Sequence, residues 1–203
     1  MTSAPEAAVR LGSTTDVAAL MELEARYYVG NLDPAQRADG FVSILHSARW
    51  FHDTVADGGI HVAEIDGDIA GFIAVTPPPN AAGPRLEPII RAVVDLAEVL
   101  DFRGAPIARQ RWAFRGPVLI DRAARGRGVY TAFNDVTRQA YRDRYDVGVL
   151  FVAADNPRSL HTTTTKLGAQ SLAEFDADDR RYHFLAYAFD GGNAGPGGRT
   201  GDQ

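Results

Sequence analysis

The chain has 203 residues, of which 45% are hydrophobic and 23% charged, a composition typical of a single soluble domain with a substantial core. Its net charge of −5 disfavours a general affinity for nucleic acid, and the absence of cysteine excludes disulfides, cysteine metal ligands and thiolate nucleophiles. No apolar run reaches the roughly 18 residues of a membrane span, the N-terminus does not look like a signal peptide, and the histidines lack metal-ligand spacing, so we expect a cytoplasmic protein without a metal.

The first third of the chain predicts a strand, two helices and a hairpin. Apolar positions at helical spacing mark the helices, and two β-favouring runs around an Asp-Gly turn mark the hairpin. The expected elements are a strand at 8–11, a helix capped by Ser13 or Thr14, a helix over 48–56, and hairpin strands 60–65 and 69–75 around the turn 66–68.

Residues 76–110 form a stretch too long to be a plain connection between two strands. Apolar residues recur at helical spacing after Pro88, between a proline run at 77–79 and a turn at 104–106, and predict a helix of its own. Two interpretations remain open at this point. The helix is either a lid over a substrate or a cover for the sheet, the latter including a homodimer surface.

The stretch from Ile120 to Tyr130 joins a β-favouring run to a helix predicted over 128–145. Glycine at Gly126 and Gly128 lets backbone N–H groups approach a ligand closely, and three arginines (Arg122, Arg125 and Arg127) add positive charge. This combination favours binding of a phosphate group at the helix N-terminus. A Walker A loop is excluded, because the chain's lysine, Lys166, lies far downstream.

The hexapeptide Arg125–Tyr130 resembles motif A of the GNAT superfamily of acyl-CoA-dependent N-acyltransferases, whose pattern is Arg/Gln-x-x-Gly-x-Gly/Ala; Tyr130 departs from it at the last position. A second part of the resemblance lies downstream, where the strand 149–153 leads to Asn156 and a helix that ends at Leu167-Gly168. The resemblance covers the chain from Val9 to Phe189.

The resemblance implies a mixed α/β GNAT-type fold, with a central, mostly antiparallel sheet flanked by helices and an inserted helical segment between strands 3 and 4. Closing strands are then expected at 169–175 and 182–189, around the polar turn 176–180. Residues 1–189 form a single domain in this prediction, with 76–110 as the insertion. The glycine-rich tail 190–203 is expected to be disordered.

The resemblance also implies the chemistry, which is direct transfer of the acetyl group of acetyl-CoA to a primary amine of a small molecule or protein. Backbone N–H groups of the strand before the loop then stabilise the oxyanion. The residues expected to bind coenzyme A are Val118, Leu119, Ile120, Arg125, Gly126, Arg127, Gly128, Val129, Tyr130, Asn156, Arg158 and Ser159. The residues expected to line the acceptor pocket are Tyr27, Tyr28, Asn31 and Phe41.

An alkyl ammonium with a pKa of about 10 is only about one part in a thousand neutral at pH 7, so the reaction needs a base or a water relay. The carboxylate that many relatives carry on this strand is missing between residues 112 and 119. The candidates for the base are Glu22 and Glu24 on the first helix, Asp33 in the loop after it and Glu64 on the hairpin. The tyrosine expected seven residues after Asn156 is Thr163, and the segment 156–168 is one residue longer than usual, so His161 is the candidate general acid.

These gaps leave a second hypothesis open, a non-catalytic domain that binds or senses acyl-CoA. A third hypothesis, a toxin that acetylates aminoacyl-tRNA, is disfavoured by the acidic charge balance.

Overall fold

The computed structural model describes residues 7–79 and 86–191, and the expected disordered tail lies almost entirely outside them. A seven-stranded sheet has the order β1-β2-β3-β6-β7-β9-β8, and every neighbouring pair is antiparallel except β6 and β7. The strands are β1 (Ala8–Leu11), β2 (Ile60–Ile65), β3 (Asp68–Thr76), β6 (Trp112–Ile120), β7 (Val147–Ala153), β8 (Gln170–Ala177) and β9 (Arg180–Ala188). The mixed, mostly antiparallel sheet predicted from the sequence is confirmed.

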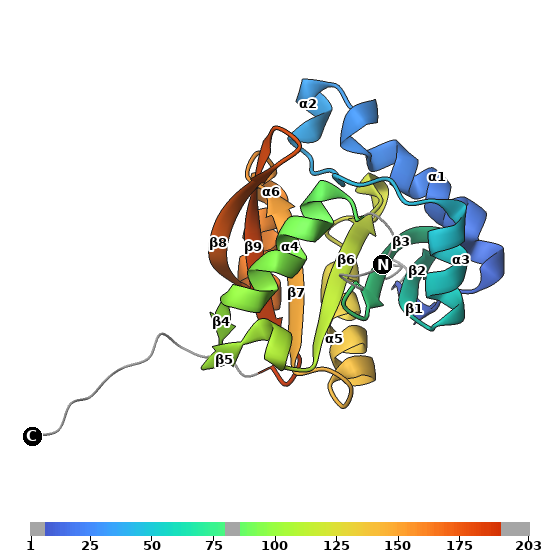
Figure 1. The fold of residues 1–203 in the computed structure, drawn as a ribbon. Helices are drawn as coiled ribbons and strands as arrows, with labels where there is room; N and C mark the ends of the chain where they lie inside the picture. The colour runs from blue at the N-terminus through green and yellow to red at the C-terminus, as the bar shows by residue number, and fades with distance from the viewer. Residues whose placement is uncertain (1–6, 80–85, 192–203) are drawn as a thin grey trace, which may run out of the picture.

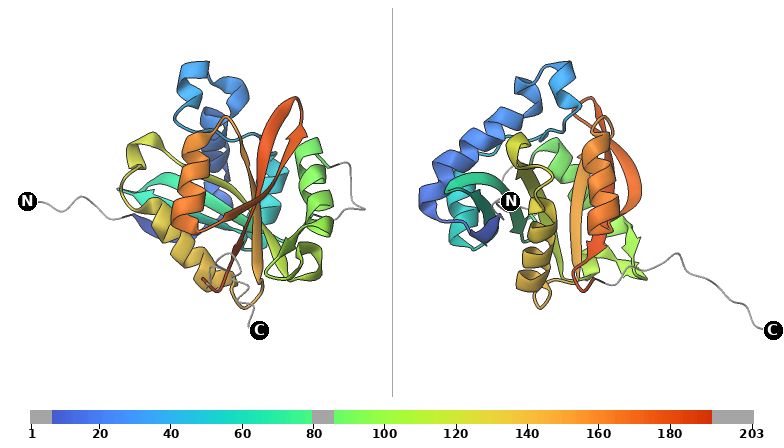
Figure 2. Two further views of the ribbon diagram at one scale, coloured as in Figure 1. Left: turned by 90° about the vertical axis from the view of Figure 1, so that its left-hand side faces the viewer. Right: turned by 180° about the vertical axis from the view of Figure 1, so that it is seen from behind.

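Helices cover both faces of this sheet (Figures 1 and 2). On one face lie α1, α3 and α4, and on the other lie α5 and α6, as the side view and the view from behind show. The helices are α1 (Val17–Tyr27), α2 (Pro34–Arg37), α3 (Ala48–Ala56), α4 (Pro88–Val99), α5 (Val129–Tyr141) and α6 (Pro157–Thr162); short 3₁₀ turns are η1 (Thr14–Asp16), η2 (Val29–Asn31), η3 (Ile107–Arg109) and η4 (Arg122–Ala124). In the described part of the chain no helix is long and apolar enough to span a bilayer.

Most helices and strands in the first third of the chain lie where the local sequence patterns predicted them. Helix α3 has the predicted bounds, and the Ser47 hydroxyl caps it by accepting a hydrogen bond from the backbone N–H of Trp50 at 3.2 Å. The hairpin turn consists of Asp66 and Gly67, both with positive φ (55° and 89°), so Asp68 already pairs with Ile65. Ser13, predicted as a cap of the first helix, instead precedes the 3₁₀ turn η1, and α1 begins after Asp16; the backbone N–H of Ser13 donates to the Asp16 carboxylate at 2.7 Å.

The inserted segment contains the predicted helix α4, which packs across β6, β7 and β9. Val93 and Ala97 on this helix are fully buried against Trp112, Phe114 and the strands beyond them. A small hairpin of β4 (Asp101–Phe102) and β5 (Ala105–Pro106), which the sequence did not predict, follows it. The helix therefore forms part of the sheet's cover along most of its length.

Two helix boundaries differ from the expectation. Helix α5 ends at Tyr141 rather than at Tyr145, because the chain turns there toward β7; the backbone N–H of Arg144 closes this turn on the Tyr141 carbonyl at 2.9 Å. After α6, residues Thr163–Leu167 form a π-helical turn, η5, which ends at Gly168 with φ 76°. A π turn holds one more residue than an α turn, so η5 accommodates the extra residue between Asn156 and Gly168.

Candidate acyl-CoA site

The central feature of the site is an opening between the two parallel strands. Strands β6 and β7 pair only at their first residues, where Trp112–Phe114 lie beside Val147–Val149. Beyond Phe114, β6 pairs only with β3, and β7 pairs only with β9. The two strands therefore separate toward their carboxyl ends and leave backbone groups of β6 without a partner strand on that side.

A β-bulge in β6 lies where the strands begin to separate. Ile73 of β3 pairs with Val118 and Val75 pairs with Arg115, so that Gly116 and Pro117 together face one residue of β3. The extra residue changes the alternation of side chains along β6, since Arg115 and Val118 then lie on the same face although three positions apart. The bulge thus directs the backbone of 116–118 into the opening.

The opening contains a cavity of about 430 Å³ that extends from the bulge to the N-terminus of α5. All three expected strand residues, Val118, Leu119 and Ile120, line it. So do Asn156, Arg158 and Ser159 at the start of α6. The structure thus brings together the two motifs that the resemblance singled out.

The loop before α5 has the shape of an anion cradle. Gly126 and Gly128 have φ of 78° and 80°, and a Cβ built on either would meet no atom within 4 Å, so the space above both is open. Helix α5 starts at Val129, and the N–H groups of its first turn have no carbonyl partner inside the helix. A phosphate fits this site because the helix N-terminus carries partial positive charge.

The arginines around the loop have different roles. The Arg125 guanidinium donates to the carbonyl oxygens of Asp39 (2.7 Å) and Ile120 (3.3 Å) and so fastens the loop to the neighbouring segment. Its burial, together with the nearby charge of Arg158, holds the pKa of Arg125 below its ordinary value. Arg158 lies 3.7 Å from the Asp39 carboxylate, half exposed at the cavity wall. Arg127, by contrast, is not among the residues that line the cavity.

Asn156 links the start of α6 to the segment that contains Phe41. Its side-chain oxygen accepts from the backbone N–H of Ser159 at 3.2 Å and caps α6, while its amide nitrogen donates to the Phe41 carbonyl at 3.0 Å. The residue is only 3% exposed. Asn156 therefore fixes the segment that contains Phe41, which also lines the cavity.

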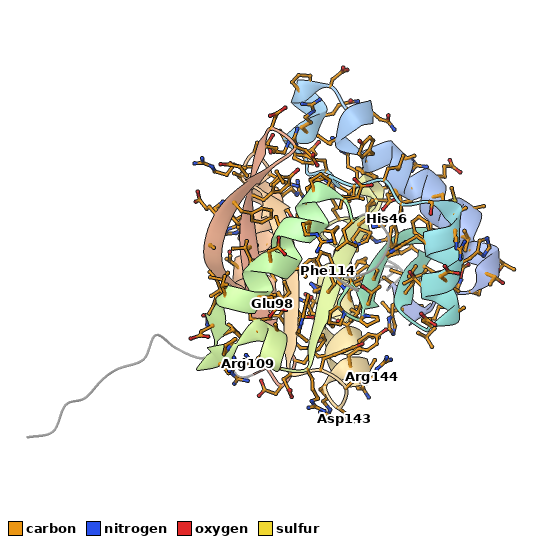
Figure 3. All side chains as sticks on the ribbon, viewed as in Figure 1. His46, Glu98, Arg109, Phe114, Asp143 and Arg144 are labelled. Carbon is orange, nitrogen blue, oxygen red and sulfur yellow. The ribbon has the colours of Figure 1, made fainter. Side chains whose placement is uncertain are left out.

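A histidine that was not predicted from the sequence also lines the cavity, on the face of the sheet that α1 and α3 cover. His46, labelled in Figure 3, precedes α3 and lines the cavity. Its ring atom Nδ1 lies 2.7 Å from one oxygen of Glu24, and its backbone N–H donates to the other oxygen at 2.8 Å. The ring also lies against the Trp50 ring, with centroids 3.9 Å apart and the ring planes tilted by 32°.

Glu24 is fully buried on α1, so its carboxylate is an acceptor that fixes the orientation of the His46 ring. With Nδ1 donating to Glu24, the remaining ring nitrogen, Nε2, is an acceptor and can take a proton. Glu24, one of the residues predicted as a base, is thus buried against His46. The only sequence signal for His46 was its position beside the Ser47 helix cap, which carries no chemistry.

The other predicted catalytic residues lie away from this cavity. Glu64 is on β2, where it forms an ion pair with Arg10 at 2.5 Å. His161 is exposed on α6 and is not among the lining residues. Neither side chain therefore reaches the opening. Residue type made both of them candidates, but it does not indicate which face of the strand or helix a side chain occupies.

Of the four residues predicted to line the acceptor pocket, two line the cavity and two do not. Tyr27 and Phe41 line the cavity, whereas Tyr28 and Asn31 do not; the Asn31 amide instead donates to the Ala25 carbonyl at 2.8 Å. Thr163, at the position where the family's tyrosine is expected, is buried and lines the cavity. Among the residues that the structure describes, no group of three or more His, Asp or Glu side chains could hold a metal ion.

A mostly antiparallel sheet with one parallel pair that separates around a glycine-rich helix start defines the GNAT acetyltransferase fold, and the chain has this fold. It resembles a GNAT-family acetyltransferase from Streptococcus agalactiae 2603 with a TM-score of 0.62, over 90% of this chain and 95% of that one, at 18% sequence identity.

Two further solved structures are similar. The N-acetyltransferase from Staphylococcus aureus Mu50 has a TM-score of 0.59 at 15% identity, over 91% of this chain and 99% of that one. The ribosomal-protein-alanine N-acetyltransferase from Brucella melitensis has a TM-score of 0.58 at 15% identity, over 89% and 99%. No protein-family model and no curated protein sequence matches the chain.

Proposed function

We propose that the protein is a GNAT-type N-acyltransferase, which transfers the acyl group of a coenzyme A thioester to a primary amine by direct attack in a ternary complex. Acetyl-CoA is the donor that the resemblance implies, and the acceptor is a small molecule or a protein. The observation that carries the proposal is the single cavity that joins the anion cradle before α5 to the His46–Glu24 pair.

The donor half of the site fits coenzyme A in a simple way. The open space above Gly126 and Gly128 admits the pyrophosphate, and the N–H groups at the start of α5 would hold it. The pantetheine arm would then follow the unpaired edge of β6 and bring the thioester to the bulge. There the N–H groups near Val118 can stabilise the oxyanion that develops on the acyl carbonyl.

The acceptor half supplies the base. In this proposal, Nε2 of His46 takes a proton from the incoming ammonium, directly or through a water, and Glu24 stabilises the imidazolium that forms. The amine lone pair then attacks the thioester carbon, the carbon–sulfur bond breaks, and the electron pair leaves on sulfur. A thiolate with an ordinary pKa of about 8.5 can depart without full protonation, so Thr163 in place of a tyrosine is compatible with turnover.

The proposal is tested by calorimetric titration with coenzyme A and by thiol release from acetyl-CoA and other acyl-CoAs across a panel of primary amines. We expect saturable binding, and thiol release that depends on the amine. Binding without thiol release for every donor and acceptor would support the acyl-CoA sensor instead. Failure to bind coenzyme A at all would refute both.

Three further statements accompany this proposal as predictions. Residues 1–189 act as a single domain, because the helix of the insertion shares one core with the sheet. The cytoplasmic location and the homodimer stay predictions, for which fractionation and analytical ultracentrifugation are the direct measurements.

A further inference from the structure

Arg115 is a buried cation without a counter-charge. It lies on β6 directly before the bulge and is 1% exposed, and no other arginine or lysine in the described ranges is buried. Of the five N–H groups on a guanidinium, the hydrogen bonds engage one, which Nη2 donates to the neutral amide oxygen of Asn134 at 2.7 Å. Nε and Nη1 have no partner among the described residues, and no carboxylate there pairs with Arg115.

The groups around Arg115 include further hydrogen-bond donors but no negatively charged acceptor. Its guanidinium carbon lies 5.6 Å from the ring centre of Tyr130 and 5.5 Å from that of Tyr187. The hydroxyl groups of both tyrosines are also buried without a hydrogen-bond partner in the described part of the chain. Cation–π contacts offset only part of the cost of burying a full charge, so the free protein leaves this group under-compensated.

Arg115 lines the cavity from the donor side. Side chains alternate along β6, so Phe114 packs toward α4 while Arg115 reaches Asn134 on α5, on the opposite face. His46, the proposed base, belongs to the segment before α3, on the face that Phe114 shares. An anion that pairs with Arg115 therefore arrives with the donor rather than with the amine.

The pyrophosphate site lies at a different turn of α5 from the one that binds Arg115. The loop and the first N–H groups of α5, which starts at Val129, would hold the pyrophosphate, whereas Arg115 is bound to Asn134 in the second turn. An anionic group at the thioester end of the donor would instead lie beside the bulge, which Arg115 directly precedes.

We propose that the site is selective for donors whose acyl group ends in a carboxylate, that is, dicarboxylic acyl thioesters of coenzyme A, with Arg115 binding the terminal carboxylate. This inference rests on the proposed N-acyltransferase function and specifies its donor. A charge-assisted contact in a buried site is stronger than a neutral one, and the carboxylate supplies the counter-charge that the protein lacks.

The bonds that form and break are the same as with an acetyl donor. The amine nitrogen forms a bond to the thioester carbon, the carbon–sulfur bond breaks, and the thiolate leaves with the electron pair. Of the two protons that the ammonium loses, one ends on the thiolate and the other is released through His46. The terminal carboxylate takes no part in the bond changes, so the product is an amide that carries a free carboxylate.

The test compares donors that differ only in the terminal group. Succinyl-CoA and butyryl-CoA have acyl chains of the same length, one ending in a carboxylate and one in a methyl group; acetyl-CoA and free coenzyme A complete the set. We expect calorimetry on the wild-type protein to show succinyl-CoA binding at least ten-fold more tightly than butyryl-CoA. Glutaryl- and malonyl-CoA then define the length that fits.

The variant Arg115→Met removes the charge and keeps an unbranched side chain. We expect it to lose the preference for succinyl-CoA while still binding coenzyme A with unchanged affinity. Arg142→Met, exposed at the C-terminal end of α5 and outside the cavity lining, serves as the matched control that keeps the preference. If Arg115→Met does not fold, the wild-type comparison decides by itself.

Three results would overturn the inference. The first is a wild-type protein that binds butyryl- or acetyl-CoA as tightly as every dicarboxylic donor while transferring acetyl groups, which leaves the proposed function intact. The second is an Arg115→Met variant that keeps the preference. The third is an equal loss of turnover with acetyl- and succinyl-CoA in that variant at unchanged binding, which would assign Arg115 to the thiolate. Absence of coenzyme A binding would refute the proposed function as well.

Discussion

Replacing His46 with asparagine separates the proposed base from its structural role. The side-chain nitrogen of asparagine occupies a position close to Nδ1, so the variant keeps a donor for Glu24, and the backbone N–H of residue 46 still donates to that carboxylate. Only the atom Nε2 and the contact of the ring with Trp50 are lost. We therefore expect the free energy of unfolding to fall by about 1 kcal/mol.

The catalytic effect should be much larger than the effect on stability. A positioned general base contributes typically about 10²–10⁴-fold to the rate, which corresponds to roughly 2.7–5.5 kcal/mol of transition-state stabilisation. We expect kcat/KM for the amine to fall by that factor in His46→Asn, while the calorimetric Kd for coenzyme A stays unchanged. His52→Asn, on the exposed side of α3, is the matched control. A His46→Asn enzyme with wild-type kcat/KM at neutral pH would refute the assignment of the base.

Three other variants test the donor site, the insertion and the core. Gly128→Val should weaken coenzyme A binding more than ten-fold in calorimetry, because its Cβ enters the space for the phosphate. The control Gly67→Val carries a comparable backbone strain of about 1–2 kcal/mol and should not affect binding. Equal affinities of the two variants for coenzyme A would exclude the loop as the phosphate site. Val93→Ala should lower the stability of the fold by about 2 kcal/mol in urea unfolding, because Val93 of α4 is fully buried against the sheet. Ile90→Ala, at the cavity wall, should change KM for the acceptor with little loss of stability. A Val93→Ala variant of unchanged stability but altered KM would favour a mobile lid over a fixed cover. Burial lowers the pKa of His61, so below about pH 6.5 the unfolded chain binds a proton that the folded chain does not, and stability falls with decreasing pH. His61→Phe should therefore make the urea midpoint depend less on pH over that range. An unchanged pH dependence of the midpoint in this variant would contradict the role of His61.

The elements predicted well from the sequence are those whose signals are local. The hairpin turn at Asp66-Gly67 requires positive φ at both positions, and the sequence supplies residues that tolerate it. The cap at Ser47 and the helical spacing after Pro88 are signals of the same kind. Boundaries were less certain where a helix ends for tertiary reasons, as α5 does before β7.

The contact between His46 and Glu24, the proposed catalytic pair, could not be predicted in this way. Glu24 and His46 are 22 positions apart, and nothing in either local pattern indicates that a buried carboxylate and a cavity histidine meet. Residue type alone favoured Glu64 and His161, but the fold pairs Glu64 with Arg10 and leaves His161 exposed. A functional side chain is defined by the direction it faces, and that direction follows from packing.

By itself, the sequence determined the local features of the proposed donor site: a glycine-rich turn at a helix N-terminus and, further along the chain, an asparagine cap. Both depend on backbone conformation within a few residues. Only the tertiary structure decided how this motif is used. It separates β6 from β7, places His46 across the cavity, and buries Arg115 without a counter-charge. These features join residues distant in the chain, and their burial and charge balance exist only once the sheet has formed.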